Sequence, residues 1–341
     1  MTDASGAGAE ALDRSAPGDG ARSGAGGPLA VRVRTEDDAS LLRPSAARLR
    51  HLVERIGGAD DHFLVVQRVP DLPDVFLQVW HAEGEEYRVE HRSSRAVFLG
   101  TDLAADERDR VVAAVVGWSL GTDGWDHGIA WEPVDADPPV DEPEVPEELR
   151  GPLEERVRTL IRCGYLDRAA LAEVAEEHLI GSARAARAGF PPGRRPVSPG
   201  QARALVDRLW LARVAQSAEW SGTTDPERVT EAFAALERAG ITAREDFTCC
   251  HGCGRSDIDG EAGPGARGYV FFHRGATASA VAGQGLSLVH GGFDGTGPTA
   301  VAVGREVVAA LAAAGLSTEW DGEPDSSILV TPVNWRKRLV G

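Results

Sequence analysis

Three of the four cysteines lie within five residues, where residues 249–253 read Cys-Cys-His-Gly-Cys. Cys250 and Cys253 have the Cys-x-x-Cys spacing that lets two thiolates reach one metal ion or one another. Gly252 and Gly254 allow the tight backbone that such a knuckle needs. The pattern therefore predicts a soft-metal site, with zinc as the expected ion.

A tetrahedral zinc site takes four ligands, and the sequence has no second Cys-x-x-Cys pair to complete one. The candidates for the remaining positions are Cys249, His251, His273 and His290. His273 and His290 both end predicted strands of the same domain, so either could reach the cysteines. The ligand set that we predict is Cys249, Cys250, Cys253 and His273.

Two other interpretations of the cluster stay open. The vicinal pair Cys249 and Cys250, together with Cys253, could exchange disulfides and act as a redox centre. Alternatively, the three thiols are reduced and simply packed near a turn, because free cysteine behaves as a small hydrophobic side chain. Cys163 stands alone at a predicted helix end, and we expect it to be packed.

Other chemistry finds little support in the sequence. Lys337 is the only lysine and no glycine loop precedes it, which excludes P-loop and pyridoxal-phosphate chemistry. Residues 117–121 match Gly-x-Ser-x-Gly, but a predicted helix precedes Ser119 where a nucleophile elbow needs a strand. The glycine-rich residues 291–297 lack the strand–loop–helix context of a phosphate loop and are predicted to form a flexible loop. The sequence favours a non-enzymatic protein; the alternative is an enzyme centred on Cys250 and Cys253.

Composition limits the class of protein. A chain of 341 residues is long enough for two cores at about 100–200 residues per domain. Its 53 acidic and 36 basic residues give a net charge of -17, which disfavours nucleic acid and suits a small molecule or a basic protein partner. The sequence has neither a long apolar run nor a secretory signal, so we expect a cytoplasmic protein that does not span a membrane.

The sequence predicts two α/β (α+β) domains with small mixed sheets, and the helices and strands of these domains must position the candidate residues. Residues 1–28 are predicted to be a disordered tail, since they have almost no large apolar side chains. Residues 29–133 predict an α/β module with a sheet of four or five strands and helices on one face. Its last strand is predicted at 129–131.

Residues 134–149 are an acidic, proline-rich linker, and residues 150–220 a helical segment. Asp167 is the predicted N-cap of one helix in this segment. A loop with Arg184, Arg187, Arg194 and Arg195 is its local basic patch. Residues 221–341 form the second α/β domain, which carries the cysteines. It opens with a helix that Asp225 is predicted to cap, and closes with a hairpin near 317–332.

The second half of the chain carries a distinctive pattern of residues, which runs from Thr224 to His273. The pattern is TD…AF…GI-x-AR-x-x-F-x-CC-x-x-CG…GYVFFH. On this pattern, residues from about 150 to 340 resemble an uncharacterised, mainly actinobacterial family described only as a domain of unknown function. The resemblance implies membership but no activity. The family tends to carry Gln-Asp where this chain has Arg274 and Gly275.

The first domain is similar to small immunity-type modules of bacterial toxin systems. The residues that carry this similarity are Gln78-Val79-Trp80, residues 87–90 (Tyr-Arg-Val-Glu) and Trp131. The similarity implies a partner-binding role. Together these observations predict a cytoplasmic binding or immunity-type protein whose second domain carries a structural metal knuckle.

Overall fold

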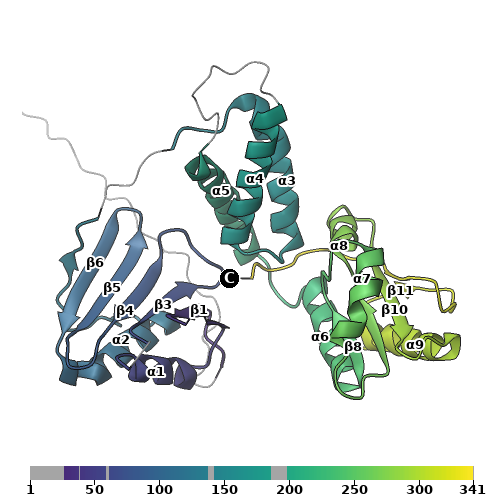
Figure 1. Ribbon diagram of the computed structural model, residues 1–341, viewed down its shortest axis with the longest axis horizontal. Helices are drawn as coiled ribbons and strands as arrows, with labels where there is room; N and C mark the ends of the chain where they lie inside the picture. Colours follow the sequence, from purple (N-terminus) through teal and green to yellow (C-terminus); the bar gives the residue numbers. More distant parts are fainter. Residues whose placement is uncertain (1–26, 38, 59–60, 137–141, 186–197, 341) are drawn as a thin grey trace, which may run out of the picture.

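The computed structural model of the chain describes residues 27–37, 39–58, 61–136, 142–185 and 198–340. Figure 1 shows a sheet module, a helical unit, and a second sheet covered by helices. The predicted α/β class is confirmed, with one seven-stranded antiparallel sheet and one five-stranded mixed sheet in the described residues. The predicted tail is almost entirely outside the described residues.

The sheet module has the strand order β2-β1-β3-β4-β5-β6-β7 and is antiparallel throughout. Its strands are β1 (Val31–Thr35), β2 (Ser40–Leu42), β3 (Phe63–Arg68), β4 (Phe76–Trp80), β5 (Tyr87–Ser94), β6 (Val97–Leu103) and β7 (Glu132–Pro133). The prediction of four or five strands was too low because β2 and β7 are too short to show alternation. The strand predicted at 129–131 was wrong: pairing with β6 begins at Glu132.

Alternation along the strands of this module separates two faces. Leu64 and Val66 on β3 and Leu77 and Val79 on β4 are buried, while their neighbours point to the other side. The buried side packs against α1 (Ala46–Arg55) and α2 (Arg108–Leu120), which follows the short helix η1 (Ala105–Glu107). The helices therefore cover one face, as predicted.

The helical unit consists of α3 (Glu147–Cys163), α4 (Arg168–Ala185) and α5 (Pro199–Ala218), packed around a shared apolar core. As predicted, the Asp167 side chain caps α4, accepting a hydrogen bond from the Ala170 N–H at 2.9 Å. The last residues of the predicted linker lie against this unit: Val145 is buried in its core, and Gln201 Nε2 donates to the Glu144 carbonyl at 3.0 Å. Residues 137–141 of the linker, and the side chains of the arginine loop, lie outside the described residues.

The second sheet has the order β11-β12-β10-β9-β8, with β8 parallel to β9 and the other pairs antiparallel. Its elements are α6 (Asp225–Arg238), β8 (Ile241–Arg244), α7 (His251–Asp257), η2 (Ile258–Glu261), β9 (Gly268–Phe271), α8 (Arg274–Val281), β10 (Leu286–Gly292), α9 (Gly297–Ala313), β11 (Thr318–Glu319) and β12 (Ile328–Val330). The closing hairpin is confirmed as β11–β12. The N-cap of α6 is Thr224, one residue before the predicted Asp225, and its backbone N–H donates to the Glu227 side chain at 2.8 Å.

The chain after β12 returns to the helical unit, as the yellow segment in Figure 1 shows. Trp335 Nε1 donates to the Cys163 carbonyl at the end of α3, at 3.3 Å. Leu339 is 3% exposed and belongs to the core formed by α3, α4 and α5. This segment therefore ties the second sheet to the helical unit.

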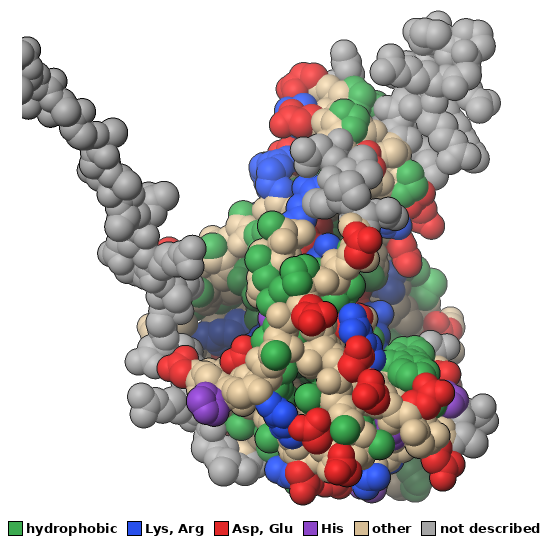
Figure 2. Space-filling model, turned by 90° about the vertical axis from the view of Figure 1, so that its left-hand side faces the viewer, with side chains coloured by type: hydrophobic (Ala, Val, Ile, Leu, Met, Phe, Trp, Pro, Cys, Tyr) green, Lys and Arg blue, Asp and Glu red, His purple; other side chains and the backbone are tan. Residues whose placement is uncertain are grey.

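The sheet module contacts the helical unit through the loop between β3 and β4. Arg168 Nε pairs with Asp71 at 2.8 Å, and its Nη1 pairs with Asp207 on α5 at 2.7 Å. The buried Trp210 also donates from Nε1 to the Asp71 carbonyl at 2.6 Å. The described residues include no helix long and apolar enough to cross a membrane. On the face seen in Figure 2, acidic and basic side chains are interspersed, with hydrophobic side chains between them.

Candidate metal centre

The loop between β8 and α7 places the cysteines on the surface of the second sheet's unit. Two hydrogen bonds fix this loop: the Phe247 N–H donates to the Phe272 carbonyl at 2.8 Å, and the Arg274 N–H donates to the Thr248 carbonyl at 3.3 Å. Thr248 itself has a positive φ of 59°, which turns the chain outward just before the first cysteine. The end of β9 therefore sets where the cysteine segment begins.

The three cysteines of this segment form one group. The Sγ atoms of Cys249, Cys250 and Cys253 all lie within 4.8 Å of one another, and those of Cys249 and Cys253 are 3.4 Å apart. Three sulfurs around one tetrahedral zinc, at about 2.3 Å from it, would stand about 3.8 Å apart. All three side chains are exposed and unpaired by disulfides. The geometry suits a soft metal ion, as the sequence predicted.

The pKa values of Cys250 and Cys253 are shifted in opposite directions. Hydrogen bonds from the Cys253 backbone N–H and from the neighbouring thiols lower the pKa of Cys250. Hydrogen bonding to the Cys249 and Cys250 thiols, together with the charge of these neighbours, raises the pKa of Cys253 to about 11. Cys250 also occupies the N-cap position of α7. The cluster therefore favours a thiolate at Cys250 first.

The two glycines of the segment have different roles, and neither has the positive φ that a strained turn would require. A Cβ on Gly254 would lie 2.4 Å from Phe271 Cε2, so this glycine lets α7 pack directly on β9. A Cβ on Gly252 would meet nothing within 4 Å. Gly254 is thus the residue that holds the cysteine-bearing helix against the sheet.

His273 is not a member of the group of close ligand atoms in the described residues, which consists of the three cysteines. Its Nδ1 accepts the Ala276 N–H at 3.3 Å, which caps α8. Burial lowers the pKa of His273, and the nearby His251 lowers it further. A neutral ring that accepts at Nδ1 carries its proton on Nε2. Ligation through Nε2 would therefore require His273 to release the helix cap.

His290, another candidate, lies elsewhere in the second unit. It is buried on β10, where its ring meets the edge of Trp320.

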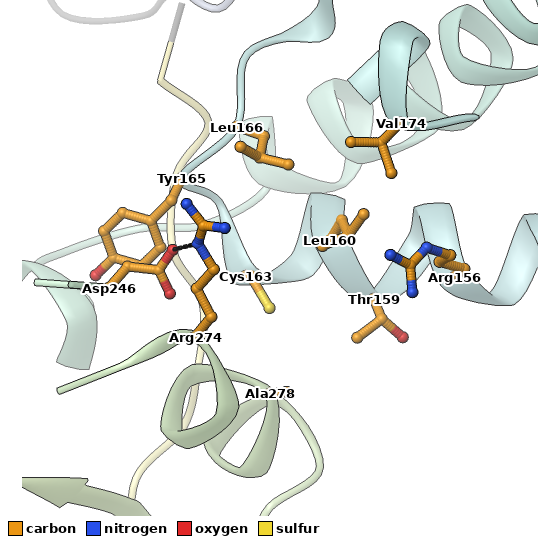
Figure 3. Close-up of a pocket in the computed structure, with 10 residues that line it drawn as sticks. All are labelled: Arg156, Thr159, Leu160, Cys163, Tyr165, Leu166, Val174, Asp246, Arg274 and Ala278. Atoms are coloured by element: carbon orange, nitrogen blue, oxygen red, sulfur yellow. Dashed lines mark ion pairs between the residues drawn. The ribbon is translucent and has the colours of Figure 1, made fainter. Parts of the chain in front are cut away.

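A cavity that the sequence did not predict lies where α3, α4 and α8 meet (Figure 3). It has a volume of about 260 Å³ and a mainly apolar lining. Asp246 lines it and accepts a hydrogen bond from Thr277 Oγ1 at 2.6 Å, and burial raises the pKa of its carboxyl. Arg274 reaches the same carboxyl at 4.0 Å. Because the lining residues come from segments more than a hundred positions apart, no sequence pattern could have revealed this cavity.

Two other residues singled out in the sequence have structural roles. Cys163 is buried beside this cavity, and burial raises the pKa of its thiol to about 11, as expected of a packed cysteine. Ser119 lies inside α2, and its hydroxyl donates to the Val115 carbonyl at 2.7 Å. It has no nucleophile elbow, in agreement with the sequence analysis.

Comparison with known proteins gives one match. No curated protein and no solved structure matches the chain. A family described as a domain of unknown function, DUF6891, matches residues 146–339. The matched region begins at α3 and ends at Leu339, so it covers the helical unit, the second sheet and the segment that ties them together, while the sheet module lies outside it. Since the match covers more than half of the sequence, the chain belongs to the DUF6891 family.

Proposed function

We propose that this chain is a non-enzymatic binding protein that holds one soft metal ion, zinc first, on Cys249, Cys250 and Cys253. The observation that supports the proposal is the close approach of three exposed sulfurs on one short segment. Thiolates are the preferred ligands of such ions. The segment is already ordered by β9, so binding requires little further ordering of the chain.

The proposed ion does not hold the fold together. A structural zinc site usually ties together segments that are distant in sequence, whereas these three ligands come from five consecutive residues. The apolar core of the second unit is built from α6, α8, α9 and the sheet and does not include the three clustered cysteines. With His273 used as a helix cap, the fourth coordination position is open to water or to an incoming ligand. We therefore propose an exchangeable surface ion in place of the structural knuckle.

The test is the metal content of the purified protein, together with cobalt substitution. We expect about one equivalent of zinc, and a cobalt complex whose charge-transfer absorption reports thiolate ligands. Cys253→Ser should abolish tight binding, and its unfolding midpoint should match that of the metal-free wild type. Cys163→Ala, which removes the one cysteine outside the cluster, should keep the ion. Metal-free protein that takes up neither zinc nor cobalt would refute the proposal.

Thiol exchange is the second candidate, and the 3.4 Å separation of Cys249 Sγ and Cys253 Sγ favours it. A disulfide between them would form by loss of two electrons and two protons to an oxidant such as oxidised glutathione. The metal-free protein should then yield one internal disulfide, and bound zinc should block its formation. Three thiols that stay reduced under these conditions would exclude this role.

A partner-binding role of the immunity type is a separate proposal, which concerns the sheet module. On the face opposite α1 and α2, Phe63 and Trp80 are paired across β3 and β4, and Trp80 is 41% exposed. A net charge of -17 suits a basic partner. The product of a neighbouring gene should bind the wild type more tightly than Trp80→Ala. Leu120→Ala, which removes an equally exposed side chain from α2, should bind normally.

A further inference from the structure

The His290 side chain is an imidazole that is buried although its ring nitrogens are not satisfied by hydrogen bonds. His290 on β10 is 2% exposed, and neither of its ring nitrogens has a hydrogen-bond partner of normal length and angle in the described part of the chain, although the Ser326 backbone lies near the ring. Burial and the charge of Arg255 lower its pKa, against a smaller opposing effect of the Ser326 backbone. Burying a polar group that has no hydrogen-bond partner destabilises the folded state. Such a cost indicates a role that the protein alone does not fulfil.

His290 lines a cavity of about 230 Å³ at the end of β10, where pairing with β12 has already stopped. Arg255 of α7, Tyr269 of β9, and Asp325 of the loop between β11 and β12 also line it. The remaining wall is the glycine-rich loop 291–297, predicted above to be a flexible loop. At about 30 Å³ per water molecule, the cavity has room for a small polar molecule of several heavy atoms.

The cavity opens onto the N-terminus of α9, a helix of 17 residues. Thr296, its N-cap, and Gly297, its first residue, both line the cavity. The N-terminus of a helix carries a partial positive charge, which favours anions. At this N-terminus Pro298 has no N–H and the Thr299 N–H donates to Thr296 Oγ1, so within the described residues Gly297 supplies the free N–H. Arg255 adds a full positive charge, and within the described residues its guanidinium makes no ion pair or hydrogen bond.

Acidic groups beside the cavity limit what the ligand can be. Asp294 is already used within the loop: it accepts from the Thr296 N–H at 2.9 Å and from Thr299 Oγ1 at 2.6 Å. It therefore belongs to the cap of α9. Asp325 has no such partner in the described residues, and a carboxylate accepts hydrogen bonds from hydroxyl groups. The lining thus offers both hydrogen-bond donors and an acceptor.

We propose that this cavity binds the phosphate group of a small hydroxylated molecule, such as a sugar phosphate. The phosphate would lie between the α9 N-terminus, the Arg255 guanidinium and the His290 ring N–H, and the hydroxyls would face Asp325. No cysteine lines this cavity, so the phosphate proposal can be tested independently of the metal proposal. Arg255 follows Cys253 by two residues, which places both sites on α7.

The experiment is a titration of the full-length protein, as purified, with ribose 5-phosphate, inorganic phosphate and unphosphorylated ribose. Calorimetry gives the dissociation constants, and ¹H–¹⁵N spectra locate the response. Ribose 5-phosphate should bind most tightly and shift Gly295, Thr296 and Gly297. Inorganic phosphate should shift the same residues at higher concentration, and ribose alone should not bind measurably.

Arg255→Gln tests the site without touching the core, because Arg255 is exposed. We expect it to weaken binding of ribose 5-phosphate at least tenfold. Arg305→Gln removes another exposed charge, from the middle of α9, and should bind like the wild type. His290→Phe should also bind less tightly, and unfolding curves would show whether that variant folds. No shift at the glycine loop with any of the three ligands, or equal weakening by Arg255→Gln and Arg305→Gln, would overturn the proposal.

Discussion

At the scale of the residue, Asp246 is a carboxyl that the fold holds away from water. Burial raises its pKa above the usual 3.8, so the folded protein binds its proton more tightly than the unfolded chain does. The free energy of unfolding should therefore fall as pH rises through the window above 3.8 and recover as pH falls. Asp246→Asn keeps the acceptor for Thr277 but removes the titration.

Urea unfolding of the wild type and of Asp246→Asn, from pH 4 to pH 7, measures this effect. We expect the wild type to gain stability relative to the variant as pH is lowered. Asp257→Asn, at an exposed position on α7, should show the wild-type slope. If the stabilities of the wild type and of Asp246→Asn change in parallel with pH, the pKa of the Asp246 carboxyl does not differ between the folded and unfolded states.

At the scale of the element, the packing of α7 on β9 permits a matched pair of substitutions. Gly254→Ala would push its Cβ into Phe271 and should destabilise the protein by about 1–3 kcal/mol, typical of overpacking. It should also weaken metal binding, because it displaces the helix that carries Cys253.

Gly252→Ala on the same helix meets nothing and should be neutral or stabilising by about 0.5–1 kcal/mol. Thermal unfolding and zinc affinity check both variants. Equal stability of the two would show that α7 is not seated on Phe271.

The same elements show what the sequence could predict. The cysteine cluster was predictable because its three cysteines lie within five consecutive residues, so their spacing alone brings the sulfurs together. Alternation in β4 and β5 likewise indicated which side chains are buried, whereas the apolar run at residues 63–66 predicted a wholly buried strand in which only Leu64 and Val66 are buried. His273 illustrates the limit, since its use as a helix cap depends on where α8 begins. The cavity beside His290 was not predicted because His290, Arg255 and Asp325 are distant in sequence and only the folded structure brings them together.

At the scale of the whole molecule, the segment after β12 joins two units, and Leu339 provides the test. Leu339→Ala should cost about 2–5 kcal/mol, since it leaves a cavity in the core shared by α3, α4 and α5. Hydrogen exchange should show the loss of protection in these helices. Leu211→Ala, at an exposed position of α5, should change stability by no more than about 0.5 kcal/mol. A similar effect of both would mean that the segment does not dock.

The charge of the whole molecule gives a further expectation. With a net charge of -17 and with acidic and basic side chains interspersed on the face in Figure 2, the protein should not bind duplex DNA at physiological salt. A gel-shift assay at two salt concentrations checks this. A tight complex that weakens steeply with salt would instead point to the loop with Arg187, Arg194 and Arg195.

The docking of Leu339 also sets an order of events during synthesis. The sheet module is complete once the ribosome has passed β7, and it can fold while the rest is being made. The helices α3, α4 and α5 emerge next, but their core lacks Leu339 until more than a hundred further residues have been added. At about 5–20 residues per second, this delay is on the order of ten seconds. During that interval the core of the nascent helices lacks the Leu339 side chain, so their packing is completed only when the end of the chain arrives.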